Sequence, residues 1–246
     1  MTLVRYEAQE DVAVITVDNP PVNALSPGVP GGIITGLNQA NTDSDIVAVV
    51  LVGEGRGFIA GADIRYFSKP WPDDEPKLGD VIRALEQSSK PVVAAIHGHA
   101  LGGGLELAMC CHYRVIVPQA RVGQPEVKLG IPPGAGGTQR LPRLAGAKAA
   151  LDMIVSGDPV TAQQAVSLGI CDRLIETELV EGALAFAREA GQTSSPHQLA
   201  RDRNVEVEDS DLFQTKRLQI KRRARGMRAP YACIECVEAA VELPFD

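Results

Sequence analysis

The stretch VVAAIHGHALGGGLELAMCC, residues 92–111, joins an apolar run to a helical pattern through a glycine-rich turn. Its first five residues, VVAAI (92–96), are apolar at every position, which indicates a strand covered on both faces. Glycines at a strand end allow a tight turn and let a ligand approach the backbone closely. The segment therefore predicts a strand–loop–helix unit. Its glycine-rich loop either binds a ligand or only connects the strand to the helix.

The first two-thirds of the chain repeat this alternation, and the pattern after residue 146 is entirely helical. We therefore predict the α/β fold class with a C-terminal helical segment. Strands are expected at 12–17, 47–52, 92–96 and 114–117, and helices at 29–40, 77–87, 102–112, 147–155, 161–168, 178–192 and 230–242.

Local signals predict where several of these helices begin and end. Ser26-Pro27 supplies an N-cap and a first-turn proline for the helix at 29–40. Thr161 and Gln164 have the spacing of a capping box, and Gly169 marks the end of that helix. The polar stretch GQTSSPHQ at 191–198 is typical of a linker.

Composition excludes several functional classes. The 246 residues are 45% apolar and 22% charged, which is typical of one large globular domain or one domain with a small appendage. A net charge of −7 argues against general nucleic-acid binding. Five sparse cysteines, no secretory leader and no apolar run near the roughly 20 residues of a membrane span predict a cytoplasmic protein.

The loop at 98–103 has a rival interpretation as a dinucleotide-binding turn, because it follows a strand and opens a helix. That site expects an acidic residue at the end of the next strand, where Pro118-Gln119-Ala120 stands. Glu106, in the first turn of the helix, would also repel a pyrophosphate. No Walker-type lysine follows any glycine loop, so nucleotide binding is disfavoured.

Four motifs occur in one order: NPPVNALS (19–26), GFIAGADI (57–64), HGHALGGGLELAMCC (97–111) and VGQPEVKLGIPPGAGGTQRLPRL (122–144). Together they resemble the crotonase (enoyl-CoA hydratase/isomerase) family, and the likeness runs from about residue 4 to 190. The resemblance implies a spiral of repeated strand–strand–helix units that binds acyl-CoA thioesters. It implies no metal and no cofactor, since CoA enters as part of the substrate.

The form NPPVNALS and the tail RAPYACIECVEAAVELPFD resemble the hydratase part of multifunctional fatty-acid oxidation proteins. We therefore expect a crotonase core at 1–192 and a C-terminal helical extension at 193–246. The end at Asp246 leaves open a single-domain relative or a fragment of a longer parent. The resemblance implies a homotrimer or hexamer, or a place in a multifunctional complex.

By motif position, the backbone N–H groups of Ala62 and Gly103 match the two donors that hold the thioester oxygen. The resemblance assigns water activation to Glu106, and to Glu126 the holding of water and delivery of a proton to the α-carbon. Alone, each glutamate has a simpler explanation, as a dipole-stabilising residue for Glu106 and a solvated loop residue for Glu126. Glu106 nevertheless lies among apolar neighbours, where an idle charge is costly.

Five further residues are candidates for substrate binding. Asp63 is either a helix N-cap or a ligand contact, and Arg65 either faces CoA phosphates or is plain surface. By resemblance, Ile64, Val22 and Ala24 line the substrate path.

These residues predict an enoyl-CoA hydratase of fatty-acid β-oxidation. The alternatives are a 3-to-2 enoyl-CoA isomerase, or a non-catalytic module of the same fold that binds RNA or protein. Cys233-x-x-Cys236 lacks further ligands for a zinc site, so we interpret both as half-buried helix residues. The seven Lys and Arg residues between 216 and 228 lie near acidic residues at 205–211, which favours ion pairs or a solvated face.

Overall fold

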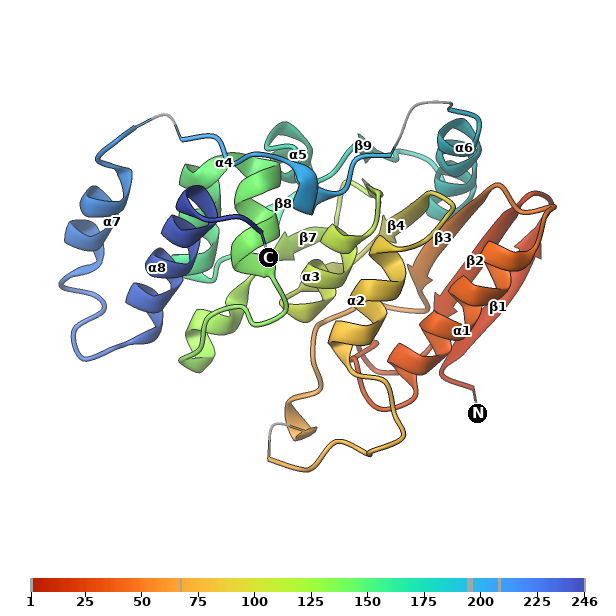
Figure 1. Ribbon diagram of the computed structural model, residues 1–246, viewed down its shortest axis with the longest axis horizontal. Helices are drawn as coiled ribbons and strands as arrows, with labels where there is room; N and C mark the ends of the chain where they lie inside the picture. The colour runs from red at the N-terminus through yellow and green to blue at the C-terminus, as the bar shows by residue number, and fades with distance from the viewer. Residues whose placement is uncertain (1, 67, 194–196, 208, 246) are drawn as a thin grey trace.

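The computed structural model describes residues 2–66, 68–193, 197–207 and 209–245. Among these residues, a six-stranded sheet has the order β1-β2-β3-β4-β6-β9 and a three-stranded sheet has the order β5-β7-β8 (Figure 1). The strands are β1 (Val4–Gln9), β2 (Val12–Val17), β3 (Ala48–Gly53), β4 (Val92–Ile96), β5 (His99–Leu101), β6 (Tyr113–Ile116), β7 (Arg121–Gly123), β8 (Val160–Thr161) and β9 (Arg173–Leu174).

Helices follow the strands and cover both faces of the larger sheet. The α-helices are α1 (Val29–Thr42), α2 (Leu78–Glu86), α3 (Gly103–Cys110), α4 (Gly137–Ser156), α5 (Ala162–Ser167), α6 (Leu179–Gly191), α7 (Leu212–Ile220) and α8 (Ala229–Glu242). Short 3₁₀ turns are η1 (Ile64–Tyr66), η2 (Pro125–Leu129) and η3 (Ala200–Asp202).

The chain winds as a spiral that contributes to each sheet in turn. From β4 in the larger sheet it passes to β5 in the smaller sheet and then into α3. The next turn repeats this path through β6 and β7, which pair in parallel with β4 and β5. Ile59, which follows β3, bridges Ala100 of β5 in parallel. The expected crotonase-like spiral of strand–strand–helix units is thus confirmed.

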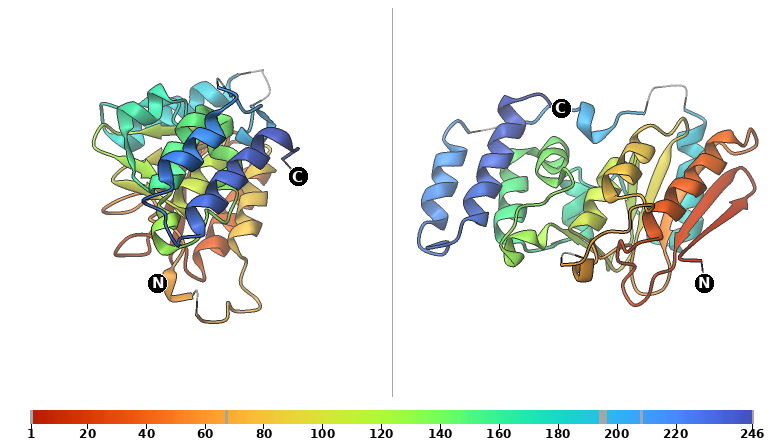
Figure 2. Two further views of the ribbon diagram at one scale, coloured as in Figure 1. Left: turned by 90° about the vertical axis from the view of Figure 1, so that its left-hand side faces the viewer. Right: turned by 60° about the horizontal axis from the view of Figure 1, so that its bottom comes forward.

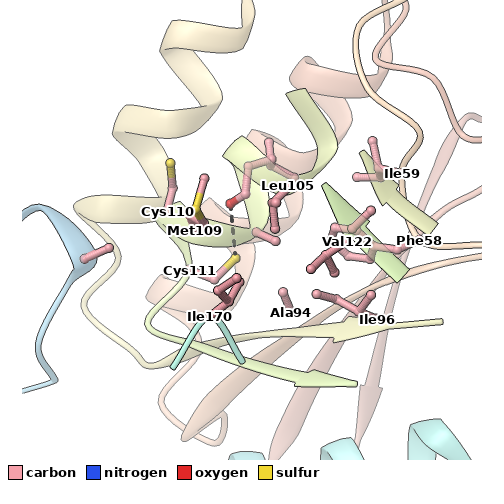
Figure 3. Close-up of a cluster of buried hydrophobic side chains, with 14 of the residues drawn as sticks. Phe58, Ile59, Ala94, Ile96, Leu105, Met109, Cys110, Cys111, Val122 and Ile170 are labelled. Carbon is pink, nitrogen blue, oxygen red and sulfur yellow. Dashed lines mark hydrogen bonds between the residues drawn. The ribbon is translucent and has the colours of Figure 1, made fainter. Parts of the chain in front are cut away.

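Side chains of the central strands alternate between two apolar clusters, because successive residues of a strand point to opposite faces. Ile15 and Leu51 lie in the larger cluster with α1, α2 and α3, whereas Val14 and Val50 pack with α6 on the other face. The four predicted strands are therefore confirmed, and so is the prediction that the strand at 92–96 is covered on both faces. Figure 3 shows the part of the larger cluster that includes Ala94, Ile96, Leu105, Met109 and Val122.

The start of α1 differs from the prediction. Gly28, with φ 92°, occupies the N-cap position, and Pro30 lies in the first turn. The Ser26 hydroxyl does not cap the helix but donates to Asp63 Oδ2 at 2.9 Å. At α5 the prediction is confirmed, because Gln164 N–H donates to Thr161 Oγ1 at 3.3 Å and the Gln164 carboxamide accepts from Thr161 N–H.

The expectation of an entirely helical pattern after residue 146 was wrong in detail. β8 and β9 are two-residue strands that each join the edge of a sheet, so they leave no alternating pattern. α4 begins at Gly137, before the predicted start, and continues through Gly146, whose φ 76° and ψ 159° kink it. Residues 194–196 of the predicted linker lie outside the described residues.

The last two helices lie at the end of the molecule remote from β1, where α8 packs against α4 and α7 packs against α8 (Figures 1 and 2). Ile234 and Val237 of α8 belong to the same apolar core as Leu141 and Leu151 of α4. The boundary between residues 192 and 193 stays a prediction. No helix in the described part of the chain is long and apolar enough to cross a membrane.

Candidate active site

A largely apolar cavity of about 600 Å³ opens where α2, α3, η2 and two loops meet. Parts of the chain that are distant in sequence supply its wall, because the spiral brings the ends of successive turns together. Five of the predicted site residues line this cavity: Ala62, Ile64, Gly103, Glu106 and Glu126.

Two backbone N–H groups lie close together at the cavity wall. A Cβ built on Gly103 would lie 3.3 Å from the Ala62 nitrogen. Among the described residues, no hydrogen bond of a turn, loop or cap uses the N–H of Ala62 or of Gly103. Gly103 is the first residue of α3, where N–H groups lack partners within the helix and the helix dipole favours negative charge. The pair can receive an anionic oxygen.

Glu106 is held inside the protein by its own helix. All residues of α3 are buried, and Glu106 itself is only 2% exposed. Its Oε1 accepts two backbone hydrogen bonds, from Ala135 N–H at 2.7 Å and from Gly137 N–H at 2.8 Å. Burial raises the pKa of this carboxyl, while the two N–H donors and the positive charge of Arg140 oppose the rise.

Glu126 lies on η2 and faces the same cavity. Burial raises its pKa to about 7, and the charge of Glu106 adds to the rise. The backbone N–H of Glu126 donates to its own carboxylate and opposes the rise, whereas the two N–H donors of the 135–137 loop serve Glu106. The two carboxyl groups therefore interact but differ in environment, so the proton of the pair favours Glu126.

Gln124 is a site residue that the sequence analysis missed. Its side chain is fully buried, and with its amide nitrogen turned toward Glu126 it donates to both carboxylate oxygens at 3.1 Å. The signal was its place two residues before Glu126 in Gln124-Pro125-Glu126, but a buried amide cannot be told from a solvated one without the fold.

Two glycines before Glu106 are required by close approaches. A Cβ on Gly102, whose φ is 51° and ψ −126°, would lie 2.8 Å from Glu126 Oε1. A Cβ on Gly104 would lie 2.0 Å from the Ile59 carbonyl oxygen. The glycine run thus lets the start of α3 contact η2 on one side and the backbone at Ile59 on the other.

The remaining predicted residues lie around a second hollow of about 430 Å³, which shares Ala62 and Ile64 with the first. Val22 and Ala24 line it. Asp63 also lines it, but its carboxylate accepts from Arg65 N–H at 3.0 Å and from the Arg65 guanidinium at 2.7 Å. The bonds from Arg65 hold the pKa of Asp63 well below its usual range.

Asp63 therefore acts as the cap of η1, one of the two alternatives, and contacts Ser26 as well. The Arg65 side chain is 73% exposed at the edge of the second hollow, where it pairs with Asp63. This position is compatible both with a contact to CoA phosphates and with a plain surface residue, because the wall of the second hollow meets the solvent there.

Cys233 and Cys236 lie on α8, fully buried and half-buried respectively. In the described ranges, no three His, Cys, Asp or Glu side chains lie close enough together to hold a metal ion. Within the basic run, the described residues include the ion pairs of Lys216 with Asp152 and of Arg217 with Glu238. These partners belong to α4 and α8 and not to the acidic stretch at 205–211.

Comparison with known proteins agrees with this geometry. Residues 7–223 match the family described as Enoyl-CoA hydratase/isomerase. The chain is 46% identical, over 99% of its length, to the peroxisomal bifunctional enzyme of Danio rerio, of which it spans 34%. It is 41% identical to a probable enoyl-CoA hydratase of Bacillus subtilis, covering 81% of this chain and 80% of that protein.

Among solved structures, Pseudomonas aeruginosa DspI superposes with a TM-score of 0.72 at 32% identity, over 79% of this chain and 82% of that one. The chain spans about a third of the length of the bifunctional relatives that it matches. The match over most of the chain, together with the spiral fold, shows that the protein belongs to the enoyl-CoA hydratase/isomerase family.

Proposed function

We propose that this chain is an enoyl-CoA hydratase, which adds water reversibly and in the syn sense to trans-2-enoyl-CoA to give 3-hydroxyacyl-CoA. One observation carries the proposal: a buried and a half-buried carboxyl group, both with raised pKa values, line the same apolar cavity as the N–H groups of Ala62 and Gly103, which no turn, loop or cap hydrogen bond uses among the described residues. The names of the relatives, an enoyl-CoA hydratase and bifunctional enzymes, support it.

The N–H groups of Ala62 and Gly103 would bind the thioester oxygen. Attack of hydroxyl on the β-carbon moves an electron pair onto that oxygen, and preorganised donors stabilise the charge as it develops. Loss of one such donor typically costs about 10²–10³ in rate. Small residues suit both positions because the thioester must approach the backbone.

The two glutamates divide the proton transfers. Glu106, whose carboxylate is stabilised by two N–H donors, takes a proton from water as the hydroxyl forms its bond to the β-carbon. Glu126, with a pKa of about 7, retains a proton near neutral pH and delivers it to the α-carbon. Protonated Glu106 and ionised Glu126 then exchange one proton through solvent, which restores the starting state.

Several properties complete the proposal. Hydration by these groups needs neither a metal ion nor a redox cofactor, because every proton and electron pair is accounted for by water, substrate and the two carboxyls. We propose a homotrimer or hexamer, or a place in a larger multifunctional chain, which light scattering of the purified protein tests. A cytoplasmic location is tested by imaging a tagged protein, and the peroxisomal names of the relatives give the competing result.

The decisive assay follows loss of the conjugated enoyl thioester of crotonyl-CoA. We expect saturable hydration by the wild type and a loss of about 10²–10⁴ in kcat for Glu126→Gln. Wild-type activity no higher than that of Glu126→Gln would overturn the proposal. A parallel incubation with a 3-enoyl-CoA distinguishes an isomerase, which would convert it without hydrating crotonyl-CoA.

A further inference from the structure

A buried ion pair contacts the 135–137 loop, whose N–H groups donate to Glu106. Arg140 of α4 and Glu86 of α2 have side chains only 4% and 7% exposed. Arg140 donates from Nε and Nη2 to Glu86 Oε1, at 3.0 and 2.5 Å. The other oxygen, Oε2, accepts from Arg201 at 3.0 Å. Because a buried charge is costly unless it is paired, this network fixes the Arg140 guanidinium in one place.

The same guanidinium contacts the Glu106 loop. Arg140 Nη1 donates to the Ala135 carbonyl oxygen at 3.2 Å, and a Cβ built on Gly136 would lie only 2.0 Å from Nη1. Ala135 and Gly137 are the residues whose N–H groups donate to Glu106 Oε1. The loop therefore accepts from Arg140 on one side and donates to Glu106 on the other.

The C-terminal segment covers this network. The Phe245 ring lies over three guanidinium groups, those of Arg140, Arg143 and Arg201, at 4.8, 5.1 and 4.6 Å. A ring in this position excludes water, and a charge acts more strongly on its neighbours where water is excluded.

We propose that Arg140 is a positioning residue for hydration: it orders the 135–137 loop so that two N–H groups point at Glu106, and it favours the ionised form of that carboxyl. The inference rests on the proposed function. Arg140 does not line the cavity, so it acts through the loop and through its charge and not on the substrate.

Among the described residues, three charged or titratable groups interact with Glu106 and a fourth pairs with one of them. They are Arg140 from α4, Glu126 from η2, Cys110 from its own helix and, behind Arg140, Glu86 from α2. Arg140 is the one that favours the carboxylate, since Glu126 opposes ionisation when charged and the pKa of the Cys110 thiol is raised by burial. Removing the Arg140 charge should therefore raise the pH below which hydration fails.

The test is the pH profile of kcat for crotonyl-CoA in Arg140→Met, Arg140→Lys and the matched control Arg143→Met. Arg143 also lies under Phe245, but its Nη1 donates to the Gln139 carbonyl and not to the Glu106 loop. We expect Arg140→Met to lower kcat at least about tenfold and to move the acid limb up by about one pH unit, with KM little changed.

Arg140→Lys should keep the acid limb in place while still losing rate, because it retains the charge without the guanidinium bonds. Arg143→Met should change neither. If Arg140→Met lowers kcat with an unmoved acid limb, Arg140 is only a structural brace and the proposal fails. An unchanged kcat in Arg140→Met would overturn it as well.

Two further measurements test the role of Arg140 separately from the proposed function. Glu86→Gln removes the neutralising partner, so it should move the acid limb down, opposite to Arg140→Met; a shift in the same direction would contradict the proposal. NMR titration of the Glu106 carboxyl carbon needs no substrate and should show a higher pKa in Arg140→Met. A wild type that does not hydrate crotonyl-CoA would refute the proposed function, whereas an unmoved Glu106 titration would refute the role of Arg140.

Discussion

Replacing Gly102 by alanine should disable the site by displacing Glu126. The added Cβ would lie 2.8 Å from Glu126 Oε1, whereas ordinary contact begins at 3.4 Å, so the carboxylate must move by about 0.6 Å. Misplacement of a reacting group by about 1 Å can cost 10²-fold in rate, and we therefore expect kcat to fall by about 10- to 100-fold. The backbone at φ 51° and ψ −126° also disfavours alanine, by about 1–3 kcal/mol of folding free energy.

The control for this backbone strain is Gly226→Ala. Gly226 has φ 80°, and a Cβ there would meet nothing within 4 Å, so the variant adds strain without displacing a carboxylate. Hydration of crotonyl-CoA and urea unfolding are measured for both variants. We expect both to lose stability and only Gly102→Ala to lose kcat. Equal kcat values in the two variants would refute the assignment of Glu126 to the reaction.

Three further predictions concern the carboxyl pair and the C-terminal segment. Because Glu126 must be protonated to deliver a proton, kcat for hydration should fall as the pH rises through about 7; a flat profile from pH 6 to 9 would contradict this. A pKa raised on folding means that the folded state loses stability as the pH rises from about 4.5 to 7. In urea unfolding, Glu126→Gln should therefore be more stable than the wild type by about 1–3 kcal/mol at pH 8 and no more stable at pH 4. Equal gains in stability at both pH values would exclude burial of the Glu126 charge as the cause. Phe245→Ala removes three cation–π contacts, so it should lower the free energy of unfolding by about 1–3 kcal/mol and reduce kcat less than tenfold. An unchanged urea midpoint would contradict the expected loss of stability.

The strands that form the centre of the fold could be predicted because their sequences are apolar throughout. VAVITV at 12–17 and VVAAI at 92–96 lie between helices, so both faces of each strand are buried. The strand β1, VRYEAQ, was missed because it has exposed polar residues and lies at the edge of the described sheet, paired with β2. β8 and β9 were missed because two residues are too few to produce a pattern.

The candidate site could be predicted in part, from motifs of contiguous residues and not from an apolar pattern. Glu106 and Glu126 stand within motifs of contiguous residues, and the resemblance to a family is carried by such motifs. Gln124 required the fold, because only the packed structure shows that its amide is buried beside Glu126. The Arg140–Glu86–Arg201 network joins residues 54 and 115 positions apart, a separation at which no local pattern relates the partners.

The capping of α1 shows how tertiary contacts override a local signal. Ser26 is a good N-cap residue by type, yet its hydroxyl is used by Asp63, a residue 37 positions away. Gly28 then occupies the cap because its left-handed conformation turns the chain into the helix without a side-chain penalty. Asp63 in turn needs Ser26 and Arg65 because its carboxylate is almost fully buried.

The central claim is that Glu106 and Glu126 act together in one hydration step. The measurement that tests it most directly is kcat/KM for crotonyl-CoA in the wild type, Glu106→Gln, Glu126→Gln and the double variant. If the two carboxyls share one step, each single change should cost at least about 10²-fold and the double variant should be little worse than the poorer single variant. Either single variant within tenfold of the wild type, or losses that multiply in the double variant, would contradict the account.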